Sequence, residues 1–267
     1  MNNLIAADSA LKPAVFVHIQ KTAGTAIVNL ARSAYGNHHV ISHGDFFEEL
    51  DHFPLADYEY FQKEQVQRKI SDILFISGHF GYDFAKQFIR DRYSFTFLRN
   101  PVERVLSFYF YCKTCDPTKF EIYELSQRLS LNEFLKLGFS APQIRGFIWN
   151  CQVLQLAHGF GSSQELHLTE NELLKLAMRH LDDFSYIGFT ETFEKDRDNI
   201  LRDLGIALPN EITVANANPG RPVFNELPQS TQNLLLELTE LDRVLYKKAW
   251  SEKNSIIKTR IRKWLKI

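Results

Sequence analysis

Lys21 stands in front of a run of small residues in the stretch "VFVHIQKTAGTAIVNLA", residues 15–31. Gly24 and its small neighbours would let backbone N–H groups approach an anion closely, and the positive end of a following helix would add to the attraction. In a nucleoside-triphosphate P-loop the lysine instead ends the loop and opens the helix. The order is inverted here, which predicts an anion site of another kind. The alternative is an ordinary strand-to-helix turn whose lysine points to water.

A second pattern of this type lies in "FLRNPVERVLSFY", residues 97–109. Arg99 ends an apolar run and can hold a phosphate through two hydrogen bonds. Ser107 lies two turns into a helix that Pro101 opens, and its hydroxyl can supply a further bond to the same group. Two anion sites at neighbouring strand ends predict a ligand with two phosphates, such as a doubly phosphorylated nucleotide.

Alternating strands and helices must position these residues. Short apolar runs rich in β-branched and aromatic residues predict buried strands at 14–19, 73–77, 93–99 and 186–190. Helical spacing follows Gly24, with Thr22 and Thr25 as N-cap candidates and Gly36 as a stop, and recurs after Pro101 and at 170–181, 193–204 and 228–250. This alternation predicts an α/β fold with a mostly parallel sheet and helices on both faces. Residues 37–63 have no clear period and are expected to leave the sheet.

The composition fits a soluble globular protein. The 267 residues carry a formal net charge of −1, which gives no global field to attract nucleic acid. No apolar run reaches the roughly 18 residues that span a bilayer, and the start resembles no signal peptide, so we expect a cytoplasmic protein. Three cysteines, with "CKTC" as the only close pair, favour free thiols over a disulfide framework or a metal site.

The two anion patterns resemble a known family. "FVHIQKTAGTAI" is similar to the 5'-phosphosulfate loop of sulfotransferases that use 3'-phosphoadenosine 5'-phosphosulfate (PAPS), and "FLRNPVERVLSFY" to their 3'-phosphate motif. The variants most resemble the carbohydrate branch, related to heparan sulfate 2-O- and 6-O-sulfotransferases. "ISGHFGYDF", "YIGFTETFEKDRDNIL" and "ELPQSTQNLLLELTELDRVLYKKA" resemble further segments of that branch. The likeness covers most of residues 15–249 and implies a P-loop-like, nucleotide-binding sulfotransferase fold.

The resemblance implies transfer of a sulfuryl group from PAPS to a hydroxyl or amine of a carbohydrate-type acceptor, without a metal. Lys21 would lie near the oxygen that bridges phosphate and sulfur, where negative charge grows as the bond breaks. Arg221, with Gly220, would belong to a late loop over the 3'-phosphate; a solvated arginine in a turn is the alternative. The residues assigned to donor binding are Lys21, Thr22, Ala23, Gly24, Thr25, Ala26, Arg99, Ser107 and Arg221.

The general base is a separate question. His79 is favoured because imidazole titrates near neutral pH. From chemistry alone, the carboxylates of Glu and Asp are rivals for this role, and His79 is one of nine histidines in the sequence. The resemblance of "ISGHFGYDF" implies the base role for His79. His18 is expected to be a strand-end residue bonded to backbone, and His43 and Asp45 are candidates for the acceptor side.

One segment departs from the resemblance. "NCQVLQLAHG", residues 150–159, is similar to a segment that reads approximately N-x-Q-T-R in bacterial relatives, with Val153 and Leu154 in place of Thr and Arg. The acceptor is therefore left open. A non-catalytic nucleotide- or sulfoglycan-binding module is the alternative function; a P-loop kinase is less favoured because no G-x-x-x-x-G-K-[ST] occurs.

The C-terminus carries an amphipathic basic stretch. We expect one domain over residues 1–267, with a core at about 14–250 and a basic tail at 254–267. The tail alternates Ile, Trp and Leu with Lys and Arg, so it could lie on an anionic inner membrane surface. The alternative is that its aliphatic face packs on the domain and its cations are solvated.

Overall fold

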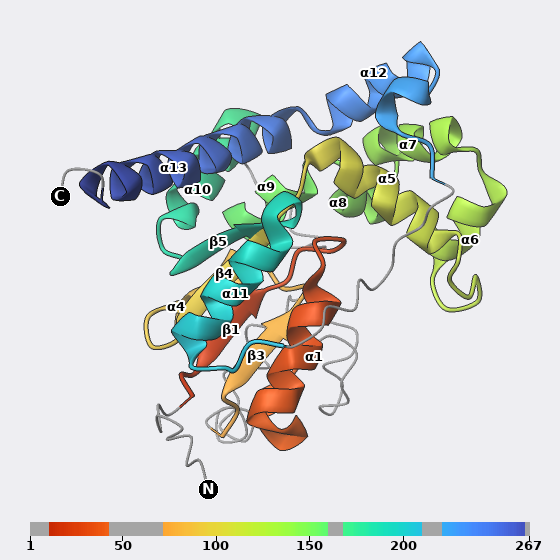
Figure 1. Ribbon diagram of the computed structural model, residues 1–267. Coiled ribbons are helices and arrows are strands. Elements are labelled where there is room, and N and C mark those ends of the chain that lie inside the picture. The colour runs from red at the N-terminus through yellow and green to blue at the C-terminus, as the bar shows by residue number, and fades with distance from the viewer. Residues whose placement is uncertain (1–10, 43–71, 160–167, 210–220, 265–267) are drawn as a thin grey trace, which may run out of the picture.

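Five parallel strands form the centre of the computed structural model, which describes residues 11–42, 72–159, 168–209 and 221–264, with side chains up to residue 254 (Figure 1). The sheet order is β2-β3-β1-β4-β5, and every pairing is parallel. The strands are β1 (Ala14–Val17), β2 (Val40–Ile41), β3 (Phe75–Gly78), β4 (Tyr93–Leu98) and β5 (Tyr186–Phe189). The predicted α/β class with a mostly parallel sheet is confirmed.

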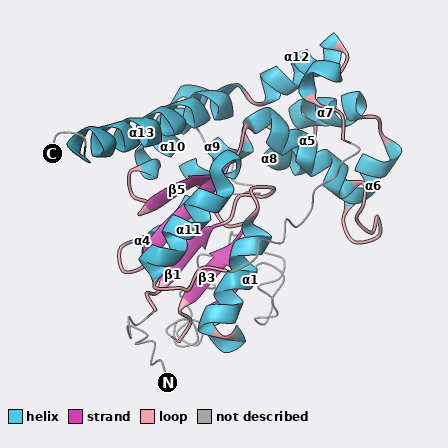
Figure 2. Ribbon diagram, in the orientation of Figure 1, coloured by secondary structure: helices cyan, strands magenta, loops and turns pink. Residues whose placement is uncertain are grey.

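Both faces of the central strand are buried. In β1, Val15 and Val17 pack into the core on one face, and Ala14 and Phe16 into the core on the other. The second face is covered by α1 (Gly24–Tyr35) and α11 (Phe193–Leu204), which lie side by side across the sheet (Figure 2). Burial on both faces explains why the strand has a continuous apolar run rather than an alternating one.

The first face carries the larger helical layer. One cluster of buried side chains joins residues of β1 and β4 to residues of every helix in this layer, so the core is continuous from the sheet through the helices. The helices are α4 (Tyr82–Ile89), α5 (Pro101–Cys112), α6 (Glu121–Arg128), α7 (Leu131–Ser140), α8 (Pro142–Ile148), α9 (Cys151–Ala157), α10 (Glu170–Leu181), α12 (Gln229–Leu238) and α13 (Glu240–Trp264). Short 3-10 turns are η1 (Asn37–His39), η3 (Thr190–Thr192) and η4 (Phe224–Glu226).

Several element boundaries differ from the sequence predictions. The helices at 170–181 and 193–204 match, whereas β1 and β4 end before the polar residues that follow them. The two-residue strand β2 was not predicted; it lies in the stretch 37–63, most of which is outside the described residues. The helical run expected at 228–250 is confirmed in part: the chain is helical there, but it breaks at Thr239 into α12 and α13.

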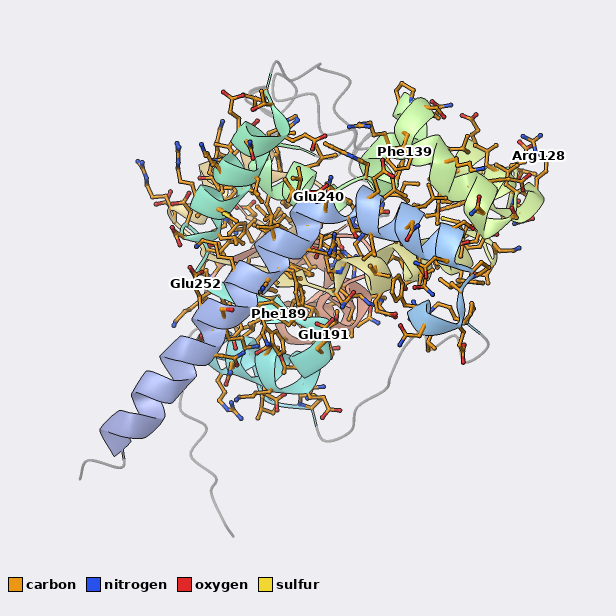
Figure 3. All side chains as sticks on the ribbon, turned by 90° about the horizontal axis from the view of Figure 1, so that it is seen from above. Arg128, Phe139, Phe189, Glu191, Glu240 and Glu252 are labelled. Carbon is orange, nitrogen blue, oxygen red and sulfur yellow. The ribbon has the colours of Figure 1, made fainter. Side chains whose placement is uncertain are left out.

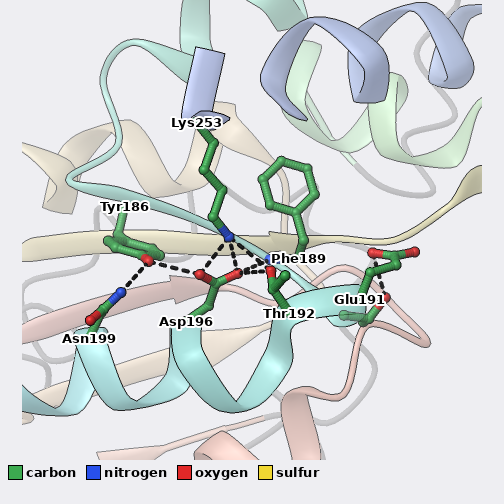
Figure 4. Close-up of polar contacts among 8 residues, drawn as sticks. Tyr186, Phe189, Glu191, Thr192, Asp196, Asn199 and Lys253 are labelled. Carbon is green, nitrogen blue, oxygen red and sulfur yellow. Dashed lines mark hydrogen bonds and ion pairs between the residues drawn. The ribbon is translucent and has the colours of Figure 1, made fainter. Parts of the chain in front are cut away.

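The helix α13 is anchored to the edge of the sheet formed by β5 (Figure 4). Lys253 forms an ion pair with the carboxylate of Asp196, which is fully buried, and donates to the hydroxyl of Thr192 at 2.9 Å. Asp196 also accepts from the backbone N–H of Phe189 at 2.8 Å and from the hydroxyl of Tyr186 at 2.9 Å. This buried network joins α13 to β5 and α11. Beyond it, the backbone of α13 extends past the other described elements (Figure 3).

Candidate functional site

The turn between β1 and α1 has an unusual backbone. Lys21 and Ala23 adopt left-handed conformations, with φ values of 68° and 65°. The expected caps at Thr22 and Thr25 are wrong: Ala23 is the N-cap residue, and no side chain among the described residues caps the helix. Thr22 instead donates its hydroxyl hydrogen to the carbonyl of Ile19 at 2.7 Å. The N–H groups at the start of α1 thus lack a side-chain acceptor, which suits an anion there.

Gly24 is required by close packing against His18. A Cβ built at Gly24 would lie 2.1 Å from Nε2 of the His18 ring, so no larger residue fits without a shift. The His18 ring stacks on Phe16, with centroids 5.1 Å apart. The absence of a side chain at Gly24 therefore lets the backbone of the turn pack directly against the ring of His18.

Arg99 follows β4, the strand that pairs with β1. Its guanidinium donates through Nη1 to the backbone carbonyl of Lys21 at 3.0 Å. The two cation-bearing turns predicted from the sequence are thus in contact, as parallel neighbouring strands require. Asn100 caps α5 by accepting from the N–H of Glu103 at 3.2 Å, and its own N–H donates to Glu191 at 2.7 Å. The turn after β4 is thereby held on both sides.

One stripe of α5 faces the β1–α1 turn. Glu103, Ser107 and Tyr111 are spaced by four residues, so they lie on one side of the helix, about 6 Å apart along its axis. At one end of the stripe, the guanidinium of Arg221 forms an ion pair with the carboxylate of Glu103 and donates to the backbone carbonyl of Glu103 at 3.1 Å. Lys21 places its Nζ 3.7 Å from the ring centroid of Tyr111 at the other end. Ser107 lies between these two cations.

The contact with Glu103 shows that Arg221 is not a solvated arginine. An arginine in a solvated turn was the alternative, but Arg221 is half-buried against the first turn of α5. It also lies close enough to Arg99 for its charge to contribute to the lowered pKa of that guanidinium. Gly220, the predicted partner of Arg221 in the late loop, lies outside the described residues.

His79 follows β3, on the other side of β1. Its Nδ1 lies 2.8 Å from the backbone carbonyl of His18, and the two rings are 4.5 Å apart. A carbonyl can only accept, so Nδ1 carries the hydrogen and Nε2 of the neutral ring is the basic nitrogen. The backbone carbonyl of His18 thus fixes the tautomer that a general base needs.

Two glutamines of α9 tie the three strand ends together, and sequence reasoning missed both. Gln152 accepts from the N–H of Arg99 and donates to its carbonyl, each at 3.0 Å. Gln155 donates to the carbonyls of His18 at 3.2 Å and Phe80 at 2.8 Å. Both side chains are fully buried. The sequence signal for Gln152 is the N-x-Q match in "NCQVLQ", and the resemblance attaches acceptor contacts to the residues after it.

The departures Val153 and Leu154 lie on the same helix. Val153 is fully buried in the core and Leu154 is partly buried against it, so Val153 at least has no access to an acceptor. The helix α9 therefore contributes to the site through Gln152 and Gln155, which hold the backbone that follows the strands.

The electrostatics of the site favour a bound anion. Burial lowers the pKa of Lys21 to about 8, and the positive charges of Arg99 and Arg104 contribute to the decrease. Burial also lowers the pKa of Arg99, and Arg221 adds to this effect. Among the described residues no carboxylate lies within 4.0 Å of the charged nitrogens of Lys21 or Arg99. An anion would relieve this accumulation of half-buried positive charge.

Other predicted residues are not brought into the site or cannot be placed. His43 and Asp45 lie outside the described residues, as do the side chains of the basic tail after residue 254. Cys112, Cys115 and Cys151 are free thiols. Within the described residues, no group of three or more His, Cys, Asp or Glu side chains gathers as for a metal ion. No helix searched there is long and apolar enough to cross a membrane.

Comparison with protein families gives a match to the sulfotransferase family over residues 11–249. The match spans all the strands and every residue of the site described above. The chain belongs to the sulfotransferase family. Comparison with curated proteins gave no match. The family reaction is sulfuryl transfer, and membership supports that reaction for this sulfotransferase.

Proposed function

We propose that this sulfotransferase transfers a sulfuryl group from PAPS to a hydroxyl of a carbohydrate-type acceptor. The observation that carries the proposal is the convergence of three neighbouring strand ends. Lys21 follows β1, Arg99 follows β4 and His79 follows β3. The side chain of Arg99 donates to the backbone carbonyl of Lys21, and the side chain of His79 donates to that of His18. These are the residue types that would hold the anionic donor and accept a proton from the acceptor.

The donor fits the groups that are present. The turn at Ala23 and Gly24 offers backbone N–H groups without a side-chain cap, and a Cβ at Gly24 would fill the space over His18. Thr22, Thr25 and Ala26 would surround this first phosphate site. Arg99, Ser107 and Arg221 would form the second, on the stripe of α5. The presence of two such sites at neighbouring strand ends supports a nucleotide with phosphates at both its 5' and 3' positions.

The reaction needs a base on one side of the sulfuryl group and a cation on the other. Nε2 of His79 would take the proton of the acceptor hydroxyl as the new oxygen–sulfur bond forms. The bond from sulfur to the bridging phosphate oxygen breaks, and the charge left on that oxygen would be stabilised by the Lys21 ammonium. Lys21 and His79 follow adjacent parallel strands, β1 and β3.

The proposal also covers the acceptor class and the location of the protein. The likeness of "FVHIQKTAGTAI" and "FLRNPVERVLSFY" to the carbohydrate branch supports a glycan, and Val153 speaks against the acceptor contacts of that branch. We propose one domain over residues 1–267 and a cytoplasmic location, with the tail at the membrane surface as a further prediction. A non-catalytic nucleotide- or sulfoglycan-binding module is the alternative function.

The test is direct. The protein would be incubated with PAPS labelled with radioactive sulfur and a panel of glycans and lipid-linked sugars, with Lys21→Ala as the matched control. Transfer of label to a glycan, lost in the variant, is the expected result. Binding of PAPS without transfer to any acceptor would favour the non-catalytic module.

A further inference from the structure

The ammonium group of Lys21 lies against an aromatic ring. Its Nζ is 3.7 Å from the ring centroid of Tyr111, in the last turn of α5. The backbone of Lys21 is fixed independently, by its left-handed conformation and by the hydrogen bond from Arg99 to its carbonyl. The ring therefore determines where the free end of this flexible side chain lies.

A second aromatic residue packs against the ring of Tyr111. Tyr123 of α6 packs against Tyr111 with centroids 6.4 Å apart and rings at 89°, and Phe120 packs on Tyr123 in the same edge-to-face manner. Yet Tyr111 is 42% exposed, which is uncommon for an aromatic residue that only fills a core. Its position is supported, while part of its surface stays accessible to solvent.

We propose that Tyr111 is a positioning residue for Lys21, whose ring holds the ammonium toward the donor side of the site before the donor binds. The proposal rests on the role of Lys21 in the proposed function. It assigns Tyr111 a part that neither the anion motifs nor the strand ends predicted.

The electrostatic surroundings of Lys21 give the ring its importance. The charged groups that face Lys21 are Arg99 and Arg104, which disfavour a further cation, and the nearby thiols are Cys112 and Cys115. Burial raises the pKa of the Cys112 thiol to about 12, so it is neutral at working pH. The electron-rich face of a tyrosine ring stabilises a cation without supplying a competing anion. A carboxylate in its place would instead bind Lys21 and compete with the donor.

The ring rather than the hydroxyl is the part that acts. Burial raises the pKa of the Tyr111 phenol to about 12, so the hydroxyl is not an anionic partner for Lys21. Tyr111→Phe keeps the ring and removes the hydroxyl, whereas Tyr111→Leu removes the ring. Phe120→Leu is the matched control, because Phe120 is 46% exposed and belongs to the same aromatic group, where it packs on Tyr123.

The first measurement needs no activity. Acetylation of Lys21 by acetic anhydride would be followed by mass spectrometry across a pH series in the wild type and the three variants. Burial lowers the pKa of Lys21 to about 8, so labelling should rise with a midpoint near that value. Loss of the ring removes stabilisation of the cation, so Tyr111→Leu should lower the midpoint by about half a pH unit, while Tyr111→Phe and Phe120→Leu should leave it unchanged.

The second measurement uses the PAPS transfer assay. We expect Tyr111→Leu to lower kcat roughly tenfold, with a smaller change in the KM for PAPS, because a misplaced cation stabilises the leaving group less. An unchanged labelling midpoint in Tyr111→Leu would overturn the proposal, as would an equal shift in Tyr111→Phe or Phe120→Leu. If the midpoint shifts as expected while the wild type transfers nothing, the positioning role stands and the proposed function fails.

Discussion

Asn150 and Asp242 each cap the helix to which the other belongs. The side-chain oxygen of Asn150, at the start of α9, accepts from the N–H groups of Leu241 at 2.9 Å and Asp242 at 3.1 Å in α13. The carboxylate of Asp242 accepts from the N–H groups of Gln152 at 3.2 Å and Val153 at 2.7 Å in α9. Both residues are buried. Because Gln152 holds the backbone of Arg99, this reciprocal capping connects the C-terminal helix to the proposed donor site.

The first prediction concerns Asp242. Asp242→Ala leaves two buried N–H groups of α9 without an acceptor, so we expect a loss of about 2 to 5 kcal/mol in the free energy of unfolding. Donor affinity should fall as well, because Gln152 loses its support. Urea unfolding and calorimetry with PAP would measure the two effects. Glu240→Ala, on the exposed surface of the same helix, is the control and should change neither.

The second prediction concerns the pH dependence of that loss. Burial raises the pKa of Asp242 to about 6, whereas the pKa of an aspartate in an unfolded chain is about 4. Because the pKa is higher in the folded state, the folded protein binds this proton more tightly than the unfolded chain does. The contribution of the carboxyl to the free energy of unfolding is therefore full below about pH 4 and is lost as the pH rises to about 6. The destabilisation by Asp242→Ala should therefore be larger at pH 4 than at pH 7. A penalty that grows with pH would show that the carboxylate form is the stabilising one.

The third prediction concerns the proposed 3'-phosphate site. Arg99→Ala and Ser107→Ala should each weaken binding of PAP by about 1 to 3 kcal/mol, because each removes a hydrogen bond to a charged phosphate. Isothermal titration calorimetry measures the loss. The matched controls are Arg90→Ala, at the exposed position directly after α4, and Ser33→Ala, at an exposed position on α1. If the site variants bind PAP as tightly as the wild type, the phosphate is held elsewhere.

The local sequence was sufficient to predict the parts of the fold that depend on local pattern. The buried runs gave the strands and, through the parallel sheet, the contact between the turns of Lys21 and Arg99. The helix break at Thr239 was not predictable in this way, since the apolar spacing continues through it and the cap that starts α13 comes from Asn150. Gln152 and Gln155 were missed for the same reason: their partners are backbone groups far away in the chain.

The fourth prediction concerns Lys21. Lys21→Ala should remove most of kcat while leaving measurable affinity for PAPS, because the ammonium matters most when charge develops on the leaving oxygen. In the wild type, kcat/KM should fall above about pH 8, since burial lowers the pKa of Lys21 to about that value and the neutral amine cannot stabilise the charge. Initial rates across pH 6 to 10 measure both. An alkaline limb that persists in Lys21→Ala would belong to another group.

The last prediction concerns His79 and the identity of the base. His79→Ala should abolish transfer and keep the affinity for PAP, because the residue follows β3 and would meet the acceptor rather than the second phosphate site on α5. The hydrogen bond from Nδ1 to the His18 carbonyl leaves Nε2 as the nitrogen that takes the proton, so His79→Gln, which keeps a hydrogen-bond donor but cannot act as a base near neutral pH, should be equally inactive. Single-turnover transfer and PAP calorimetry on both variants separate chemistry from binding. Full activity in His79→Gln would assign His79 a structural role and leave the proton to a carboxylate, for which Asp45 is the first candidate to replace.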